Sequence, residues 1–407
     1  MRVCVVGSGG REHALADVLG RTADVVVTPG NAGIPGSTAT PPEEVGADLF
    51  VVGPEVPLVD GLADRLRAQG KLVFGPGADG ARLEGSKAWM KEVLAEAGVP
   101  TARHRAFTEV EPALAFLRTL PGLYVVKTDG LAAGKGVFVT ESFAEAADDV
   151  RAKLSGASFG RAGRQVVVEE GLTGSELSVL CVCDGVTGVP LAPAQDFKRV
   201  GDGDAGPNTG GMGAFSPVAG IDMDMVVDVA IEPTLQALRK RDIDYRGVLY
   251  AGLMRTPEGL KVIEFNVRFG DPEAQVVLPR LSCDLAAMLA EAAAGKTESA
   301  PTFVSDAAVC VVLAVEGYPE SPRPGDVIAG IDGAEALDGV AVYCAGVAPG
   351  GRAHELVTAG GRALNVIGQA PTIAAARARA YEGVGRISWP GMQFRTDIAA
   401  AAANKEP

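Results

Sequence analysis

The sequence has few basic residues. Of its 407 residues, 37 are Lys or Arg and 51 are Asp or Glu, so the formal net charge is −14. No basic run offsets this charge, and a nucleic-acid backbone would be repelled by such a surface. Small anionic substrates are still allowed, because a local basic pocket is enough to hold them.

Zinc-type cysteine pairs and long apolar runs are also missing. The six cysteines include no CxxC pair, and Cys181 and Cys183 stand in a strand-like run, LSVLCVCDG, which favours buried thiols over a redox or metal role. No stretch approaches the ~18 apolar residues of a membrane-spanning helix, and the opening MRVCVVGSGG does not look like a signal peptide. We therefore expect a cytoplasmic protein that binds neither membrane nor nucleic acid.

The chain contains enough apolar residues, 47% of the total, for three domains. In residues 1–83 strands alternate with helices, one of them expected over 58–69, which predicts a parallel sheet with ligand sites at the carboxyl ends of its strands. Residues 84–300 read as an α+β domain rich in hairpins, with a lid subdomain over about 120–185. A polar linker then precedes a small C-terminal domain, residues 301–407.

The stretch VVKTDGLAAGKGVFV (125–139) is rich in glycine but is not a P-loop. The motif G-x-x-x-x-G-K-[ST] requires glycine at Asp129 and a hydroxyl at Gly136, and it requires a helix where this sequence continues as a strand. A glycine loop between two strands remains, with Lys127 before it and Lys135 at its tip. We interpret it as a lid over nucleotide phosphates.

The first glycine turn, VVGSGGREHA, fails the dinucleotide fingerprint because its third glycine position is Glu12. A strand, a turn and a helix N-terminus remain, which favour an anion, although a tight turn without a ligand is the alternative. Asn31 and Glu55 end two further strands. Because parallel strands end at one edge of the sheet, these groups outline one pocket.

Two later stretches suit a nucleotide and its metal ion. VVVEEGLTGSELSV ends a strand at Glu169-Glu170 and is suited to an adenine hinge, although two surface acids on a hairpin would look the same. In LKVIEFNVRFGDPEAQ, Glu264 and Asn266 share one strand face and offer oxygen ligands for Mg²⁺. Arg268 follows on that face and suits an anionic group, with a structural ion pair as the alternative.

The segment AQDFKRVGDGDAGPNTGGMGAFSP (194–217) is too long and too rich in glycine for a simple turn. It contains Asp196, Lys198, Arg199 and Asn208, so a functional loop is expected.

In their order along nearly the whole chain, these stretches resemble the phosphoribosylamine–glycine ligase (glycinamide ribonucleotide synthetase) family of ATP-grasp enzymes. The resemblance is carried by GSGGREHAL, PGNAG, VGPEVPLVDG, LEGSKAWMK, DGLAAGKGV, QDFKRVGDGDAGPNTGGMGAFSP, YAGLM and VIEFNVRFGDPEAQ. It implies a Rossmann-like N-terminal domain, an ATP-grasp domain with a glycine-rich lid, and a small mixed β domain at the C-terminus. It also implies that ATP, glycine and 5-phosphoribosylamine give ADP, phosphate and glycinamide ribonucleotide through glycyl phosphate, in de novo purine synthesis. We expect a monomer.

The resemblance also implies roles for individual residues. ATP would be bound by Lys87, Lys127, Gly134, Lys135, Gly136, Glu169, Glu170, Leu172 and Glu176, and Mg²⁺ or Mn²⁺ by Glu264 and Asn266. Phosphoribosylamine would be bound by Gly9, Gly10, Arg11, Glu12, Asn31 and Glu55. The glycine and phosphoryl-transfer region would be lined by Asp196, Lys198, Asn208, Thr209, Gly210, Gly211, Arg268 and Asp271, with Lys127, Lys135, Arg268 and Asp196 as catalytic groups.

Three departures from the family pattern stand out. Phe197 replaces a usual His, Thr128 replaces a usual Ala, and the segment 37–47 is short, which should leave one edge of the first sheet less covered. The alternatives are another ATP-grasp carboxylate–amine ligase and a catalytically inactive nucleotide-binding module. A dehydrogenase is disfavoured by the broken fingerprint at Glu12.

Overall fold

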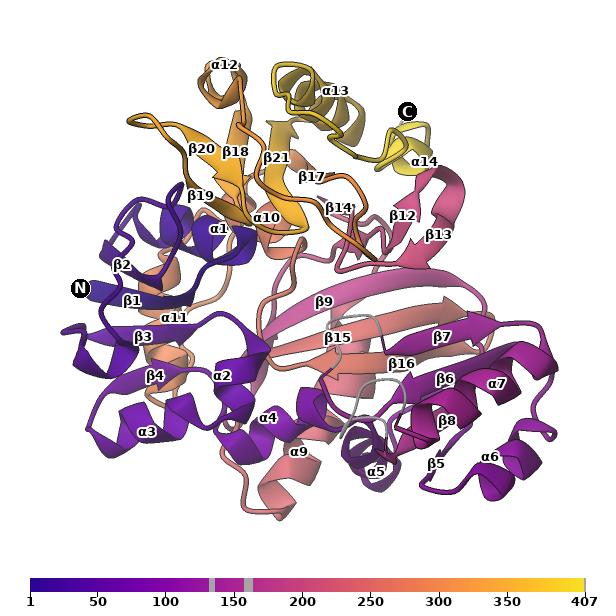
Figure 1. Ribbon diagram of the computed structural model, residues 1–407. Helices are drawn as coiled ribbons and strands as arrows, with labels where there is room; N and C mark the ends of the chain where they lie inside the picture. Colours follow the sequence, from indigo (N-terminus) through magenta and orange to yellow (C-terminus); the bar gives the residue numbers. More distant parts are fainter. Residues whose placement is uncertain (132–135, 157–163, 406–407) are drawn as a thin grey trace.

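The computed structural model describes residues 1–131, 136–156 and 164–405. Figure 1 shows the N-terminal sheet beside the long central strands, with the C-terminal sheet above both. Among the described residues, no helix combines the length and the apolar character needed to cross a membrane.

The first sheet is parallel, in the order β2-β1-β3-β4, as the alternating pattern predicts. Buried Val and Leu residues fill its strands, so helices cover both faces. The expected helix 58–69 is two helices, because Gly61 lies between them in the left-handed conformation with φ +75°. The elements are β1 (Arg2–Gly7), α1 (Gly10–Leu19), β2 (Asp24–Pro29), a 3-10 turn (Pro42–Glu44), β3 (Leu49–Val52), α2 (Glu55–Val59), α3 (Leu62–Ala68), β4 (Leu72–Phe74) and α4 (Ala78–Gly85).

The short segment 37–47 holds only that 3-10 turn, but it is tied to the first domain near its start and at the turn itself. Thr38 donates a 2.9 Å backbone hydrogen bond to Val27 on the edge strand β2. Lys71 Nζ donates to the carbonyls of Pro42 and Glu43, at 3.2 and 2.5 Å. The Thr38 bond joins the segment to the edge strand β2 without a covering helix, and Lys71, just before β4, holds the 3-10 turn.

The central region holds two antiparallel sheets, in the orders β5-β8-β6-β7 and β10-β9-β15-β16. The first contains the predicted lid hairpin, in which Lys127 pairs with Val137. The elements are α5 (Lys87–Ala97), β5 (His104–Phe107), α6 (Val110–Leu117), β6 (Tyr124–Thr128), β7 (Val137–Thr140), α7 (Phe143–Leu154), β8 (Val166–Glu170), β9 (Ser175–Asp184), β10 (Gly188–Pro190), α8 (Met223–Val226), a π turn (Val227–Ile231), α9 (Glu232–Lys240), β15 (Arg246–Thr256), β16 (Gly259–Asn266), α10 (Ala274–Val277), a 3-10 turn (Leu278–Arg280) and α11 (Leu285–Ala293).

The third large sheet is antiparallel, in the order β11-β14-β17-β21-β18, and it draws on two distant parts of the chain. Strands β11 and β14 belong to the predicted loop 194–217, yet β14 pairs with β17 in the C-terminal domain, placing Phe215 opposite Val309. The elements are β11 (Gln195–Asp196), β12 (Arg199–Gly201), a 3-10 turn (Asp202–Asp204), β13 (Ala205–Asn208), β14 (Gly213–Ser216), β17 (Ala307–Ala314), α12 (Ile331–Glu335), β18 (Val340–Cys344), β19 (Val347–Pro349), β20 (Leu356–Thr358), β21 (Arg362–Ala370), α13 (Ile373–Val384) and α14 (Ala400–Ala403).

One apolar core connects the three regions. It joins Val3 and Val5 of β1 to Leu289 of α11, to Leu180 of β9 and to Val312 of β17, all of them buried. Burial of a Val or Leu side chain stabilises a fold by roughly 1.5–3 kcal/mol, so a shared core ties the regions firmly together. The surfaces where they meet are therefore fixed in relation to one another.

Candidate active site

The turn between β1 and α1 is closed from within by the side chain of Glu12. Its carboxylate accepts a 2.6 Å hydrogen bond from the backbone N–H of Gly9 and pairs at 2.5 Å with Arg11 Nε. A Cβ on Gly7 or Gly53 would come within 2.5 and 2.1 Å of Glu12 atoms, which explains why glycine stands at both positions. The Glu12 carboxylate is therefore occupied within the turn, so a substrate would have to contact other groups of the turn.

Asn31 and Glu55 lie at the same sheet edge, and both are engaged with other parts of the chain. The Asn31 Nδ2 donates to the carbonyls of Ser8, Cys344 and Ala345, at 2.9, 3.2 and 3.0 Å. The Glu55 carboxylate accepts a 3.1 Å bond from Arg268 Nε. Burial raises the pKa of Glu55, but the positive charges of Arg268 and Arg11 outweigh burial and lower this pKa below its usual value.

Lys127 lies at the centre of a buried charge cluster. Its Nζ is 3.1 Å from Glu169 Oε2 and donates a 3.1 Å hydrogen bond to the Ile263 carbonyl. The other carboxylate oxygen of Glu169 is 3.2 Å from Lys91 Nζ, and both lysines are almost fully buried. Burial lowers the pKa of Lys91 to about 8, although Glu169 acts in the opposite direction.

The remaining residues of the predicted lid and phosphate region are only partly visible. Lys87 Nζ donates a 3.0 Å hydrogen bond to the Gly130 carbonyl, at the start of the lid, and burial lowers the pKa of Lys87. The Gly136 carbonyl accepts from the Thr128 backbone N–H at 2.8 Å, which closes the hairpin. Gly134 and Lys135, at the tip, lie outside the described residues.

The predicted hinge follows strand β8. The Glu169 carboxylate points into the charge cluster, so its side chain is not available to a base. The Glu170 N–H donates to the Arg103 carbonyl at 2.9 Å, and the Glu170 carboxylate accepts from the Arg103 N–H at 3.0 Å. Beyond Leu172, the half-exposed Glu176 carboxylate pairs with Lys198 Nζ at 3.1 Å.

Glu264 and Asn266 lie on β16, beside Arg268. Within the described part of the chain, the Glu264 carboxylate makes no hydrogen bond or ion pair. Burial raises its pKa, but the positive charges of Lys198, Lys127, Lys87 and Arg268 outweigh burial and lower it, so the carboxylate is ionised. No group of three or more His, Cys, Asp or Glu side chains suited to a metal occurs in residues 1–131, 136–156 and 164–405. A cation here would therefore need ligand oxygens from a bound nucleotide as well.

Arg268 is fixed by two carboxylates from the N-terminal side of the site. Its guanidinium pairs with Glu55 at 3.1 Å and with Glu84 at 2.9 Å, and it donates to Asn266 Oδ1 at 3.4 Å. Burial lowers the pKa of an arginine, but the charges of Glu84 and Glu55 raise that of Arg268 above its ordinary value. The arginine is thus a permanent cation next to the Glu264–Asn266 pair.

Asp196 and Lys198 bring the predicted loop to the same place. Burial, followed by the negative charges of Glu273, Glu176 and Glu264, raises the pKa of Asp196 to about 8, against the opposing charge of Lys198. Phe197, between them, packs at 6.3 Å against the ring of Phe215 and under the Arg395 guanidinium at 5.0 Å, so it serves packing.

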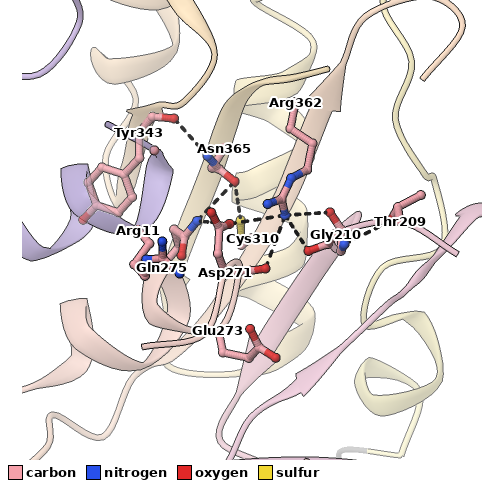
Figure 2. A network of polar contacts seen from close by, with 12 residues as sticks. Arg11, Thr209, Gly210, Asp271, Glu273, Gln275, Cys310, Tyr343, Arg362 and Asn365 are labelled. Carbon is pink, nitrogen blue, oxygen red and sulfur yellow. Dashed lines mark hydrogen bonds and ion pairs between the residues drawn. The ribbon is translucent and has the colours of Figure 1, made fainter. Parts of the chain in front are cut away.

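The glycine segment of the loop is held by many backbone contacts (Figure 2). Thr209 donates twice to the Lys198 carbonyl, and the Gly211 N–H donates to Thr209 Oγ1 at 2.9 Å. Arg362, from strand β21, donates to the carbonyls of Gly210 and Gly211. Asn208 lies just before, at the end of β13, paired with Arg199.

Sequence reasoning missed several polar residues around this region. Glu273 accepts from Tyr250 Oη at 2.8 Å and from Ser178 at 3.2 Å in a buried cluster, and Arg362 pairs with Asp271. A weak signal existed for Glu273, because it follows the metal-pair strand within GDPEAQ. The other missed residues are Glu84, Lys91, Gln275 and Asn365.

The chain matches three family profiles in succession. These are the N domain of phosphoribosylglycinamide synthetase over residues 1–84, its ATP-grasp (A) domain over 85–274 and its C domain over 308–401. The phosphoribosylamine–glycine ligase of Leifsonia xyli is 47% identical, covering 99% of this chain and 100% of that protein. The one from Streptomyces coelicolor is 48% identical, again covering 99% of this chain and 100% of that protein.

Solved structures agree. The phosphoribosylamine–glycine ligase of Thermotoga maritima superposes with a TM-score of 0.85 at 34% identity, covering 98% of this chain and 100% of that one. A biotin carboxylase domain from Hydrogenobacter thermophilus reaches 0.72 at 16% identity, covering 97% of this chain and 91% of that one. At that identity only the fold is shared.

Proposed function

The chain belongs to the phosphoribosylglycinamide synthetase family, and we propose how its residues carry out that family's reaction, the ATP-dependent ligation of 5-phosphoribosylamine and glycine. It is a ligase of purine biosynthesis with an ATP-grasp domain. The observation that supports this function best is the full-length similarity across all three domains. Another ATP-grasp ligase is disfavoured, because the biotin carboxylase domain compared above shares the fold at only 16% identity.

ATP lies, in this proposal, between the two central sheets. The Glu170 carbonyl and the Leu172 backbone would meet the adenine edge, and Glu176 would accept hydrogen bonds from the ribose hydroxyls. Lys127 and Lys87 would face the phosphates, and Lys135, which lies outside the described residues, would join them as the family resemblance implies. The buried carboxylate of Glu169 holds Lys127 in place without competing for the base.

The donor set fits a hard divalent cation, Mg²⁺ or Mn²⁺. The Glu264 carboxylate is ionised, has no partner within the described residues and lies beside the Asn266 amide oxygen. Two protein oxygens are typical of Mg²⁺, which takes its other ligands from phosphates and water. Bound between these residues and the nucleotide, the ion would neutralise phosphate charge during transfer.

Glycine would enter beside Arg268, and phosphoribosylamine would lie along the sheet edge near Gly9, Gly10, Arg11, Asn31 and Glu55. The γ-phosphoryl group moves to an oxygen of the glycine carboxylate, which breaks its bond to ADP and forms an acyl phosphate. The ribosylamine nitrogen then attacks the acyl carbon, the C–N bond forms, and phosphate leaves as the nitrogen loses a proton. Arg268 offsets the charge that develops between the two anions, and the proton released by the nitrogen passes to the departing phosphate.

We further propose a cytoplasmic monomer. Every residue assigned above comes from one chain, so the site needs no partner subunit. Light scattering during gel filtration should give a mass near the 41.6 kDa of a single chain. A stable mass near twice that value would contradict the monomer without affecting the assigned reaction.

The reaction is tested by ADP release with glycine and freshly made phosphoribosylamine, supplied together and singly. Release that requires both substrates, with glycinamide ribonucleotide identified in the products by mass, is the expected result. Release with neither substrate would leave the ATP-grasp fold but remove the substrate assignment. Tight ATP binding without release would favour the inactive binding module.

The assignment of Glu264 is tested with Glu264→Gln, which keeps the shape but removes the charge. We expect kcat to fall by about 10²-fold or more, the usual cost of removing one group that stabilises transferring charge. The matched control is Glu258→Gln, an exposed glutamate at the turn of the same hairpin, which should keep wild-type rates. Wild-type kinetics and an unchanged Mg²⁺ requirement in Glu264→Gln would remove this residue from the metal site.

A further inference from the structure

Strand β21 of the C-terminal domain begins with an arginine that reaches into the substrate region. Arg362 Nη1 donates to the carbonyls of Gly210, Gly211 and Asp271, at 2.6, 3.2 and 3.3 Å, and is 3.3 Å from Asp271 Oδ1 (Figure 2). The two segments that it joins, 208–211 and the turn at Asp271, are 60 or more residues apart in the sequence.

The glycine segment depends on external support for its conformation. Gly211 has φ +107°, a left-handed value that other residues rarely adopt, and a Cβ there would be 2.4 Å from Pro272. The Gly210 N–H donates to Tyr318 Oη at 3.1 Å, so a second group of the C-terminal domain also holds this segment. Its peptide groups are thus fixed largely by side chains from outside the ATP-grasp domain.

The charges make the Arg362 contact strong. Burial alone lowers the pKa of Arg362 and raises that of Asp271, but their mutual attraction reverses both directions. Asp271 Oδ1 also accepts a 2.8 Å bond from the fully buried Gln275. The carboxylate is therefore held from two sides, and charge-assisted bonds of this kind are about twice as strong as neutral ones.

The same strand also reaches the N-terminal turn. Asn365, three residues along β21, is 3.4 Å from Gln275 Nε2 and donates to the Tyr343 carbonyl at 3.2 Å. A Cβ on Gly10 would be 2.1 Å from Asn365 Nδ2, so the turn packs directly on this side chain. One strand therefore contacts three segments assigned to substrate binding.

We propose that Arg362 is a positioning residue for the ligation, holding the Gly210–Gly211 segment and Asp271 in the arrangement that receives glycine and phosphoribosylamine. This rests on the proposed function, whose substrates it concerns. The residue acts through backbone carbonyls and through Asp271, and it does not contribute to the nucleotide half of the site. A displacement of about 1 Å in such a site can lower the rate by about 10²-fold.

The test compares Arg362→Ala and Arg362→Lys with wild-type enzyme in the product assay. For Arg362→Ala we expect kcat/KM for both glycine and phosphoribosylamine to fall by about 10- to 100-fold, while the Kd for ATP stays within about threefold. Arg362→Lys should recover only part of the rate, because an ammonium group lacks the planar geometry that reaches several oxygens. Guanidinium ion at non-denaturing concentration should restore activity to Arg362→Ala but not to Arg362→Lys.

The control is Arg377→Ala, which removes another arginine of the C-terminal domain that binds carbonyls, those of Ile398 and Thr396, away from the site. It should keep wild-type kinetics. Normal kcat/KM in Arg362→Ala, or an equal loss of ATP affinity, would overturn the proposal. So would a loss that guanidinium does not rescue in a folded variant. If wild-type enzyme itself forms no product, the proposed function fails instead, so the two failures are distinguishable.

Discussion

At the residue scale, the most informative group is Asp196, because its pKa is raised although the cation Lys198 lies close to it. Burial raises its pKa to about 8 from an ordinary value of 3.8, with Glu273, Glu176 and Glu264 acting in the same direction. A carboxyl group held in its neutral form at neutral pH is suited to proton transfer. Ionisation of such a buried carboxyl group also lowers the free energy of unfolding of the protein.

This predicts a pH-dependent stability. Because the folded-state pKa is raised, the contribution of Asp196 is fully present below about pH 4 and is lost as the pH rises to about 8. The side-chain amide introduced by Asp196→Asn would stay neutral. The free energy of unfolding of Asp196→Asn should therefore rise relative to that of wild type between pH 4 and 8, by at most about 1.4 kcal/mol per pH unit. The measurement is the free energy of unfolding of both proteins in urea, without ligands, from pH 4 to 8.

Asp184→Asn is the matched control with the opposite sign. Burial raises the pKa of Asp184, but hydrogen bonds from Thr187, Val186 and Thr297 lower it to about 2. Its stabilising contribution is present above about pH 4 and disappears as the pH falls toward 2, so the pH curve of Asp184→Asn should run parallel to that of wild type from pH 4 to 8. Parallel pH curves for Asp196→Asn and wild type would show that Asp196 titrates normally.

At the element scale, three elements meet at one buried carboxylate. Glu169 on β8 lies between Lys91 on α5 and Lys127 on β6, with both distances near 3.1–3.2 Å. Removing one partner of a buried ion pair costs about 3–5 kcal/mol, because it leaves charge without compensation. For Lys91→Met we expect a loss in the free energy of unfolding at the lower end of this range, about 3 kcal/mol, because Lys127 still pairs with Glu169.

The measurement for Lys91→Met is the urea unfolding midpoint, and Glu96→Gln is the control. Glu96 forms an exposed pair with Arg241 at 2.7 Å, and such pairs contribute about 0–1 kcal/mol. Equal losses in the two variants would mean that the buried cluster does not hold the three elements together.

The sequence predicts these elements well where a local pattern defines them. The alternation around Lys127 and the glycine loop indicates the hairpin β6–β7, and the Glu264–Asn266 alternation places both side chains on one face of β16. Strands β11 and β14 were hidden in a glycine-rich segment, because two to four residues carry no periodicity. Strand β17, the partner of β14, begins about 90 residues later, and no local rule reaches that far.

The same limit applies to the site. Lys127, Glu264 and Arg268 were predicted, because each stands in a motif with a chemical meaning. Arg362 and Lys91 act through tertiary contacts with carbonyls and a distant carboxylate, so their neighbours in the sequence give no sign of the role. Glu12 and Glu169 were predicted as ligand-binding positions, but the buried direction of their side chains was not predicted.

At the scale of the whole molecule, the N-terminal and C-terminal domains contact each other directly. His13 Nδ1 accepts a 2.8 Å hydrogen bond from the Cys344 N–H, and Asn31 donates to the carbonyls of Cys344 and Ala345. A Cβ on Gly33 would be 2.3 Å from Cys344 Sγ, so the surfaces meet without space between them. Both end domains share a core with the ATP-grasp domain and also contact each other, which keeps the segments of the site in one arrangement.

This arrangement predicts that Asn31→Ala weakens the coupling between the two end domains. The variant removes the side-chain donor that three carbonyls share, one exposed and two partly buried, which should lower the free energy of unfolding by about 1–3 kcal/mol. Trp389 lies in the C-terminal domain and Trp89 on α5, so in a Trp89→Phe background the fluorescence reports on the C-terminal domain alone. We expect its urea midpoint to coincide with the loss of circular dichroism in the parent and to separate from it after Asn31→Ala.

Asn404→Ala, near the C-terminus, is the control and should leave the fluorescence and circular dichroism curves superimposed. Coincident curves in Asn31→Ala as well would mean that the shared apolar core, rather than this contact, makes the three domains unfold together.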